Sequence, residues 1–290
     1  MNKNFCVIGG DLRIIKLAEM LAKEENKVYT YGLDKAYELE NVNNIIFEDS
    51  LQNAAKKSSV VIGPIPFTSN GKNINSPFSN NKIIISDLFE VLHNKTLMAG
   101  SISEEILENC NSSTTIIDLM KMEELAVLNT IATAEGTIKI AIENTDKILQ
   151  SSNVLILGFG RIGKVLANKM KCLGVNVTCA ARKNKDLAWI KACGYNQTDI
   201  NELKEELSKY DIIINTVPNM ILTKDKLKFV KSDCLLIDLA SKPGGIDQDY
   251  VKEKKLKFIW ALALPGKVAP ITSAQFIKDT IYNVLKQRNI

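Results

Sequence analysis

Three glycines in the second half of the chain have the spacing of a phosphate-binding turn. Gly158, Gly160 and Gly163 follow the apolar run 154–157 and open an amphipathic stretch at 162–172. In such a turn the first glycine permits the tight bend, the second admits a pyrophosphate to the backbone, and the third lets the helix pack on the strand. Exposed N–H groups and the helix dipole then favour the anion. The residues predicted to bind a dinucleotide here are Gly158, Gly160, Arg161, Ile162 and Gly163.

The residue that usually accompanies this turn is missing. In NAD-binding units an Asp or Glu follows the second strand and accepts hydrogen bonds from the adenosine ribose 2′-hydroxyl. Here the second apolar run, 176–181, is followed by Arg182 and Lys183. A carboxylate would repel a 2′-phosphate, whereas Arg182 can pair with it bidentately and Lys183 can add a point charge. We therefore predict NADP rather than NAD; the alternative is that both side chains are solvated turn residues.

Two further loops leave strands at the edge where ligands of such folds lie. "NTVPNMIL" spans 215–222, and "DLASKPGG" spans 238–245. The residues predicted to flank the nicotinamide are Thr216, Val217 and Pro218, although Pro218 can equally just end its strand. In the second loop, Ser241 and Lys242 are placed to meet a substrate carboxylate. An ordinary solvated turn explains Lys242 as well.

The composition is that of an ordinary globular protein. The 37 Lys and Arg exceed the 33 Asp and Glu only slightly and are spread along the chain, so they form no basic stripe for nucleic acid. No stretch approaches the roughly 20 apolar residues of a membrane span and no leader pattern is present, so a cytoplasmic protein is expected. The six cysteines lack C-x-x-C spacing, which favours buried reduced thiols over disulfides or a metal site.

Short apolar runs alternate with helical segments in both halves of the chain, which is typical of parallel α/β sheets. Expected strands in the first half include "NFCVIGG", "KVYTYG", "NNIIFED", "SSVVIGPIPF", "KIIISDL", "KTLMAG" and "STTIIDLM". The second half continues with 154–157, 176–181, "YDIIINTVP", "CLLIDLAS" and "LKFIWALAL". A long helical pattern between the halves is interrupted by Gly136.

The predicted fold class is therefore α/β, with two Rossmann-like doubly wound domains and a cleft between them. Residues 1–120 with 271–290 are expected to form an N-terminal substrate domain, 121–150 an interdomain helix, and 151–270 the dinucleotide-binding domain. The C-terminal helix is expected to return to the N-terminal domain.

The histidine count excludes one common chemistry. Enzymes that oxidise 2-hydroxy acids with this kind of nucleotide domain need a histidine late in the chain as general acid and base. The only histidine here is His93, and the corresponding late region reads "IWALALPG". Oxidation of a hydroxyl carbon by a His and Glu pair is thus disfavoured.

Several motifs together resemble the family of dipicolinate synthase A subunits over essentially the whole chain. They are "VIGGDLR", "TAEGTI", "GFGRIG", "INTVPNMIL", "DLASKPGG" and "LPGKVAP", of which the last two are the most specific. Ala132 stands where the family favours Pro, and Lys242 where some members carry Arg. The resemblance implies NADP-linked oxidation of dihydrodipicolinate, or of its hydrated precursor, to dipicolinate. It also implies that the partner is the flavoprotein-like B subunit of dipicolinate synthase, in the mother-cell cytoplasm of a spore-forming bacterium.

A dicarboxylate substrate would need cations or backbone N–H groups. Gly10 and Arg13, after the first strand, and Ser101, after a later one, are the N-terminal candidates for binding it. The alternatives are a tight turn whose Arg13 pairs with an acid, and a Ser101 that only caps a helix.

Glu135 is the candidate for accepting the ring proton, with Thr133 and Thr137 as neighbouring substrate ligands. A charge on a helix surface is the alternative reading of Glu135. Lys242 is the second residue assigned to catalysis.

Two other functions remain open. A reductase of the shikimate dehydrogenase type also uses basic residues after the second strand, but it would need a Lys and Asp pair in the N-terminal domain. A regulatory subunit that binds nucleotide without catalysing a reaction is the other alternative. An oligomer of this chain is also compatible with the sequence.

Overall fold

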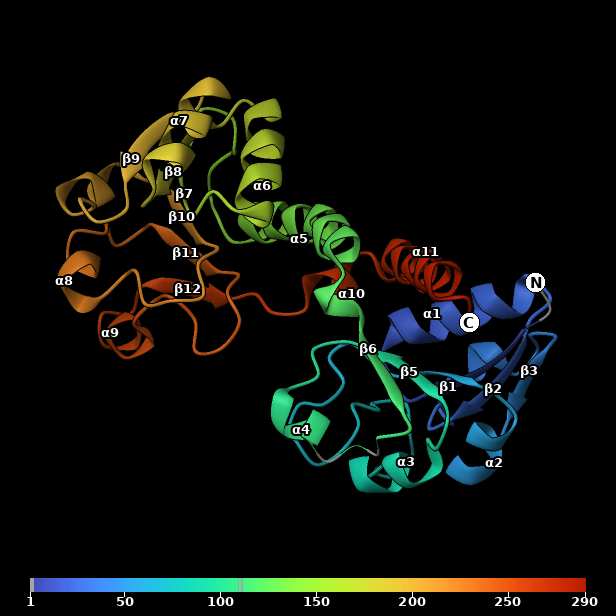
Figure 1. Cartoon of the computed structure of the whole chain (residues 1–290). Coiled ribbons are helices and arrows are strands. Elements are labelled where there is room, and N and C mark those ends of the chain that lie inside the picture. The colour runs from blue at the N-terminus through green and yellow to red at the C-terminus, as the bar shows by residue number, and fades with distance from the viewer. Residues whose placement is uncertain (1–2, 109, 111) are drawn as a thin grey trace. The chain divides into compact units, whose positions relative to one another are not determined.

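The computed structural model describes residues 3–108, 110 and 112–290, and the chain divides into two compact units (Figure 1). Unit 1 runs to Asn129 and includes Ala269–Ile290, and unit 2 is Thr130–Val268. Each unit is built around one six-stranded sheet.

In unit 1 the strand order is β3-β2-β1-β4-β5-β6, and every pair is parallel. The strands are β1 (Asn4–Ile8), β2 (Lys27–Tyr31), β3 (Ile45–Phe47), β4 (Val60–Ile62), β5 (Thr96–Ala99) and β6 (Thr115–Asp118). The helices are α1 (Leu12–Lys23), α2 (Leu51–Lys56), α3 (Ile85–Val91), α4 (Glu104–Glu108) and α11 (Pro270–Arg288), with 3-10 turns at Tyr37–Leu39 and Leu119–Lys121.

Unit 2 repeats this topology, with the parallel order β12-β11-β10-β7-β8-β9. Its strands are β7 (Asn153–Leu157), β8 (Asn176–Ala181), β9 (Asn196–Asp199), β10 (Ile212–Asn215), β11 (Leu235–Asp238) and β12 (Lys257–Trp260). The helices are α6 (Arg161–Cys172), α7 (Asn184–Ala192), α8 (Lys224–Leu227), α9 (Gln248–Glu253) and α10 (Leu264–Val268), with a 3-10 turn at Glu205–Lys209. Both sheets therefore have the Rossmann order 3-2-1-4-5-6, which confirms the predicted fold class.

The sequence explains why these segments form these elements. The inner strands are short runs of Val, Ile and Leu that are buried on both faces, as parallel sheets require. In α1 the buried residues recur at i, i+3, i+4 and i+7: Ile14, Leu17, Ala18 and Leu21. In α6 Gly163, Leu166, Ala167 and Met170 follow the same spacing, so each helix lays one apolar stripe on its own sheet.

The last helix belongs to unit 1, as predicted. In α11 the buried residues Ala274, Ile277 and Ile281 join the same core cluster as α1, and Figure 1 shows the two helices side by side. Glu24, just after α1, accepts hydrogen bonds from the Lys278 ammonium and from the Tyr282 hydroxyl, the latter at 2.6 Å.

The predicted strand at "KIIISDL" is wrong, because this segment begins α3 at Ile85. The β-branched run 83–85 favours a strand locally. The buried side chains Ile85, Leu88, Phe89 and Leu92, however, have helical spacing, and they pack beneath the sheet of unit 1. Tertiary burial of that stripe outweighs local propensity.

The long helix α5 (Glu123–Glu143) is continuous, so the predicted interruption at Gly136 is also wrong. A Cβ at Gly136 would lie 3.2 Å from Leu264 and Val268 side-chain atoms, so the glycine serves close packing against α10. That helix comprises Leu264–Val268, so most of the "LPGKVAP" motif is helical. By length and composition α5 would qualify as a membrane span, contrary to expectation, with a mean hydropathy of 1.3. The same composition suits a core helix, and its Leu125, Ala134 and Ala141 are fully buried.

Candidate functional site

The turn between β7 and α6 has two glycines that the protein's own packing requires. Gly158 has a φ of +98°, and a Cβ there would lie 2.6 Å from Thr216 Oγ1. A Cβ at Gly163 would lie 2.2 Å from the Gly158 carbonyl oxygen, so only glycine lets α6 approach this closely. These are the conformational and packing roles predicted for the first and third glycines.

Gly160 is different, because no contact among the described residues accounts for its missing side chain. Its φ is −80°, which any residue adopts, and apart from its two chain neighbours no described residue has an atom within 4 Å of the position of a Cβ. It is exposed and forms the N-cap of α6, at the positive end of the helix dipole. The open space at Gly160 therefore fits the close approach of a pyrophosphate, which is the role predicted for the second glycine. Arg161 and Ile162 form the first turn of the helix.

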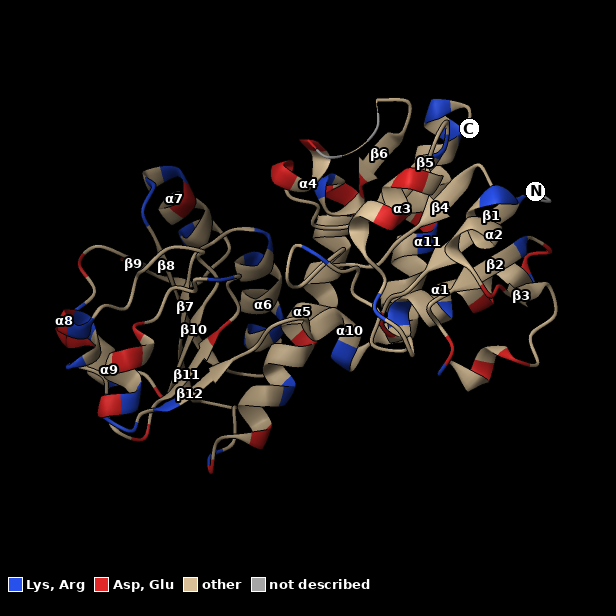
Figure 2. Ribbon diagram, turned by 90° about the horizontal axis from the view of Figure 1, so that it is seen from below, with Lys and Arg blue, Asp and Glu red and all other residues tan. Residues whose placement is uncertain are grey.

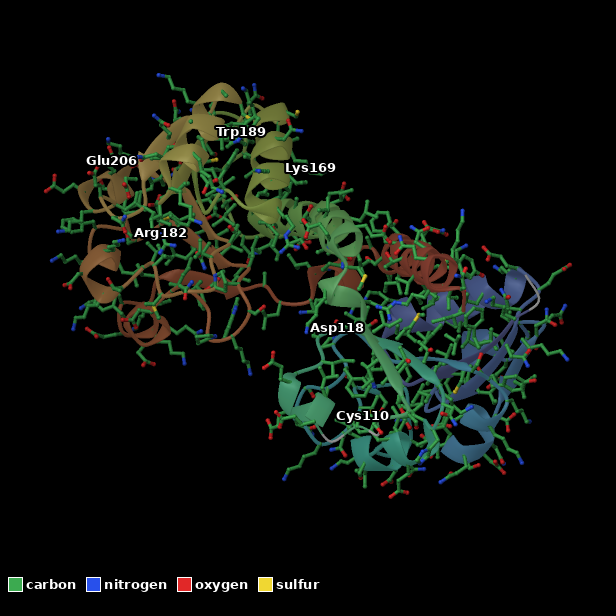
Figure 3. The ribbon with its side chains drawn as sticks, viewed as in Figure 1. Cys110, Asp118, Lys169, Arg182, Trp189 and Glu206 are labelled. Carbon is green, nitrogen blue, oxygen red and sulfur yellow. The ribbon has the colours of Figure 1, made fainter. Side chains whose placement is uncertain are left out.

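Arg182, labelled in Figure 3, and Lys183 follow β8 directly, and both are exposed. Lys183 is the N-cap residue of α7. Among the residues that the structure describes, none forms a hydrogen bond or an ion pair with the Arg182 side chain. No described protein group therefore competes for its five donors, as an anion receptor requires.

The loops after β10 and β11 lie at the same sheet edge as the glycine turn, because neighbouring parallel strands end there. Thr216 donates both its N–H and its hydroxyl to the Leu157 carbonyl oxygen, at 2.9 and 2.8 Å. A Cβ at Gly158 would also meet Val217 Cγ2 at 2.8 Å. The structure thus brings Thr216 and Val217, two of the predicted nicotinamide-flanking residues, against the glycine turn, and Pro218 follows them directly in the chain.

Ser241 and Lys242 occupy an exposed turn closed by a hydrogen bond from the Gly244 N–H to the Ser241 carbonyl oxygen, at 2.8 Å. Two residues beneath this turn were not predicted as functional: Asn215 at the end of β10 and Asp238 at the end of β11, both with no exposed surface. Their signal in the sequence is a polar residue that closes an otherwise apolar strand, in "IIIN" and "LLID".

In unit 1 the predicted substrate ligands already have partners within the protein. The Gly10 N–H donates to the Asn75 carbonyl oxygen at 2.9 Å. Arg13 is 5% exposed, pairs with both carboxylate oxygens of Asp11, and donates to the Ile65 carbonyl oxygen. These contacts favour the structural alternative, a tight turn whose arginine pairs with a neighbouring acid.

Ser101 lies in the left-handed region with a φ of +60°. Its N–H donates to Asp118 Oδ1 at 2.9 Å, and the N–H of Ile102 donates to Asp118 Oδ2 at 3.1 Å. Asp118, labelled in Figure 3, therefore holds the loop after β5, while Ser101 itself is exposed. Ser101 stays a predicted ligand of unit 1.

The α5 residues assigned to catalysis and substrate binding form contacts within unit 2. Glu135 accepts a hydrogen bond from Lys169 of α6 at 2.9 Å, and its side chain is 56% exposed. The Thr137 hydroxyl, which is buried, donates to the Thr133 carbonyl oxygen at 2.7 Å. This arrangement favours a helix-surface charge for Glu135, and its role as a proton acceptor stays a prediction.

Charge and cysteine chemistry add no second site in the described part of the chain. Positive and negative side chains are interspersed over both units (Figure 2), and no group of three or more His, Cys, Asp or Glu among the described residues is placed to hold a metal.

Burial raises the pKa of Cys179 and of Cys234 to about 12, so these thiols stay neutral. Cys172 and Cys193 are exposed, contrary to the expectation of buried thiols. Two hollows of about 560 and 740 Å³ lie in unit 1, and neither includes a predicted site residue.

Comparison with known proteins agrees with this geometry. Residues 4–120 match the family model of the N-terminal domain of the dipicolinate synthase A subunit, and residues 129–249 match that of the D-isomer specific 2-hydroxyacid dehydrogenase NAD binding domain. The A subunit of dipicolinate synthase from Bacillus subtilis (strain 168) is 32% identical over 291 residues, which cover 97% of this chain and 95% of that protein.

Solved structures give the same result. The crystal structure of the dipicolinate synthase A subunit from Bacillus halodurans superposes with a TM-score of 0.90 at 30% identity and covers 98% of both chains. The A chain of dipicolinate synthase from Bacillus subtilis has a TM-score of 0.87 at 29% identity and covers 99% of this chain and 97% of that chain. The match to the dehydrogenase NAD binding domain, together with the fold and the glycine turn, supports an oxidoreductase with a nicotinamide-dinucleotide domain. Within that class, the chain belongs to the family of dipicolinate synthase A subunits.

Proposed function

We propose that this chain is the nucleotide-binding subunit of an NADP-linked enzyme that forms dipicolinate from dihydrodipicolinate or its hydrated precursor. It acts with a flavoprotein-like B subunit in the mother-cell cytoplasm of a sporulating bacterium. The observation that carries the proposal is the open position at Gly160, in a chain that belongs to this family over its whole length.

The proposed reaction makes an aromatic ring from a dihydropyridine. Bound NADP⁺ would supply a hydride acceptor. The substrate ring loses a hydride to it and a proton to a base or to water, so the products are dipicolinate, NADPH and a proton; the hydrated precursor also loses water. In this proposal Lys242 pairs with one substrate carboxylate, and the Ser241 hydroxyl donates to it. Thr216, Val217 and Pro218 form the wall on which the nicotinamide rests.

The preference for NADP is proposed from Arg182. Its guanidinium, which pairs with none of the described residues, directly follows β8, where an NAD site would hold a carboxylate. We expect Arg182→Ala to weaken NADP binding about 10- to 100-fold, as the loss of a charge-assisted bidentate contact does, and to leave NAD binding unchanged. Direct titration of both nucleotides measures this. Lys191→Ala is the matched control, because Lys191 is an exposed cation at the far end of α7. An unchanged NADP affinity in Arg182→Ala would show that the 2′-phosphate lies elsewhere.

The activity itself is tested by mixing the purified chain with the product of dihydrodipicolinate synthase and NADP, with and without the B subunit. NADPH absorbance and chromatography of dipicolinate follow the reaction. NADPH formed by the chain alone would exclude a purely regulatory subunit. The absence of NADPH and dipicolinate from both mixtures would contradict the proposed function.

A further inference from the structure

The ends of β10 and β11 carry a buried polar pair that none of the predicted roles uses. Asn215 and Asp238 are partners in the last register position of these parallel strands. Both are completely buried, and Asn215 Nδ2 donates to Asp238 Oδ1 at 2.8 Å. A buried carboxylate is costly unless several N–H groups surround it, so its retention at this edge calls for a role.

Asn215 holds the chain on the cofactor side. Its Oδ1 accepts from the Val217 N–H at 3.1 Å, and its Nδ2 also donates to the Val217 carbonyl oxygen at 3.0 Å. Residues 216 and 217 are the ones that pack against Gly158. The Asn215 side chain therefore fixes the stretch that borders the dinucleotide turn.

Asp238 holds the turn on the substrate side. Its Oδ1 accepts from the Ala240 N–H at 2.9 Å, and its Oδ2 accepts from the Gly245 N–H at 2.7 Å. These two residues bracket the exposed turn of Ser241 and Lys242. The indole N–H of Trp260 secures the same turn by donating to the Ala240 carbonyl oxygen at 2.8 Å.

Gly245 joins the two sides. A Cβ at this residue would lie 2.4 Å from Asn215 Nδ2 and 2.8 Å from the Val217 carbonyl oxygen. Its carbonyl oxygen also accepts from the N–H groups of Ile221 and Leu222, at 2.9 and 3.0 Å. The loop after β10 and the turn after β11 are thus one hydrogen-bonded body with the Asp238 carboxylate at its centre.

We propose that Asp238, with Asn215, is a positioning residue that sets where Ser241 and Lys242 stand relative to the dinucleotide turn, and so determines the binding of a carboxylate-bearing substrate. This rests on the proposed function. Only a carboxylate offers two acceptor oxygens in this position, because one serves Asn215 and Ala240 while the other serves Gly245. Neither residue touches the reacting atoms in this proposal.

The test is Asp238→Asn in the full chain, assayed together with the B subunit. An amide keeps one acceptor. The oxygen of the new amide is expected to face Asn215 and Ala240, because the opposite orientation of the amide would lose two hydrogen bonds rather than one. Its NH₂ group then opposes the Gly245 N–H, and the turn is released. We expect the KM for dihydrodipicolinate to rise about 10- to 100-fold, the range for a buried donor left without a partner. NADP affinity, titrated directly, is expected to stay unchanged.

A second readout is independent of activity. Amide hydrogen exchange in residues 239–246 is expected to accelerate in Asp238→Asn, while exchange in the β7–α6 turn stays as in the wild type. Asp247→Asn is the matched control, because it makes the same chemical change outside the turn. Asp247 caps α9 by accepting from the Tyr250 N–H. The control variant is expected to alter neither the KM nor the exchange of 239–246.

Two outcomes would overturn the inference: an unchanged KM with unchanged exchange in Asp238→Asn, or equal losses of NADP and substrate binding. If Asp238→Asn does not fold, Trp260→Phe decides, since it releases the same turn by removing the hydrogen bond to Ala240 and part of the ring beside Gly244, and leaves Asp238 in place. A raised KM with faster exchange in 239–246 then supports the inference, and wild-type values reject it. An inactive wild type would instead contradict the proposed function, which separates the two failures.

Discussion

The two units share one topology, and their glycine turns differ in what occupies them. In unit 1, after β1, the turn is filled by the protein itself: a Cβ at Gly9 would lie 2.9 Å from Ser76 Cβ, and the Gly10 N–H is bonded to the Asn75 carbonyl oxygen. In unit 2, after β7, the position of Gly160 is open. A strand, a glycine turn and a helix therefore do not define a nucleotide site by themselves. A nucleotide can bind at such a turn only where no other segment of the protein covers it.

A related contrast appears at the ends of other strands in the two sheets. Asp118 ends β6 and accepts from the N–H groups of Ser101 and Ile102, which holds the loop after β5. Asp238 ends β11 and holds its own following turn as well as Asn215. Each unit thus uses a strand-ending aspartate to shape its carboxyl edge, and in unit 2 that edge also carries the open glycine turn.

The largest expected effect comes from glycines that packing requires. Gly163→Ala places a Cβ against the Gly158 carbonyl, so we expect a loss of about 3 kcal/mol or more in the stability of unit 2 and the loss of NADP binding. Gly10→Ala, with a φ of +107° and a Cβ 2.5 Å from Ile14, is expected to destabilise unit 1 by a similar amount and to leave NADP binding intact. Denaturation and nucleotide titration measure both. Weaker NADP binding in folded Gly10→Ala would contradict the contrast between the two turns.

Gly160→Ala separates ligand binding from folding. Because its φ is ordinary and its surroundings are open, we expect the free energy of unfolding to fall by only about 1 kcal/mol or less, the cost of alanine in place of glycine at an N-cap. The added Cβ occupies the space of the pyrophosphate, so NADP affinity is expected to fall about tenfold or more. Calorimetric titration and thermal unfolding of the same variant give both values. Wild-type affinity would mean that the dinucleotide does not approach this turn.

The attachment of α11 to unit 1 is expected to depend on pH through Glu24. Partial burial acts to raise the pKa of this carboxyl, but hydrogen bonds from Lys278 and Tyr282 outweigh it and lower the pKa. A lowered pKa means that the contribution is present above the ordinary value of about 4.3 and is lost as the pH falls through the folded-state value. We expect Glu24→Gln to cost about 1 kcal/mol at pH 7, where the partly exposed pair is screened, and less at about pH 3, where the wild-type carboxyl is increasingly protonated. Stability curves at both pH values test this, and NADP binding serves as the control.

The smallest expected effect concerns Glu135. Since it is half exposed and paired with Lys169, we expect Glu135→Gln and Lys169→Met each to change the free energy of unfolding by less than about 1 kcal/mol. Turnover is expected to be alike in the two variants. A loss of turnover in Glu135→Gln alone, with NADP binding retained, would identify Glu135 as the proton acceptor.

Much of the fold was predictable because parallel strands are buried on both faces. Runs such as "DIIIN" and "LLID" are therefore apolar at nearly every position and stand out locally. The segment 82–88 was not predictable, since a β-branched run and a helical stripe of buried residues coincide there. The helix break predicted at Gly136 was wrong for a related reason. The glycine allows close packing against α10, which is distant in the sequence, and such a contact leaves no local signal.

By itself, the sequence determined the residues of the nucleotide turn, the basic pair after its second strand, and the class of the fold, because each follows from local spacing and periodicity. Tertiary structure decided which glycine turn is open, which side chains are already paired, and that Asp238 joins two loops. These depend on contacts between residues far apart in the chain, such as Gly10 with Asn75 and Asn215 with Asp238. Only the folded backbone brings such partners within hydrogen-bonding distance.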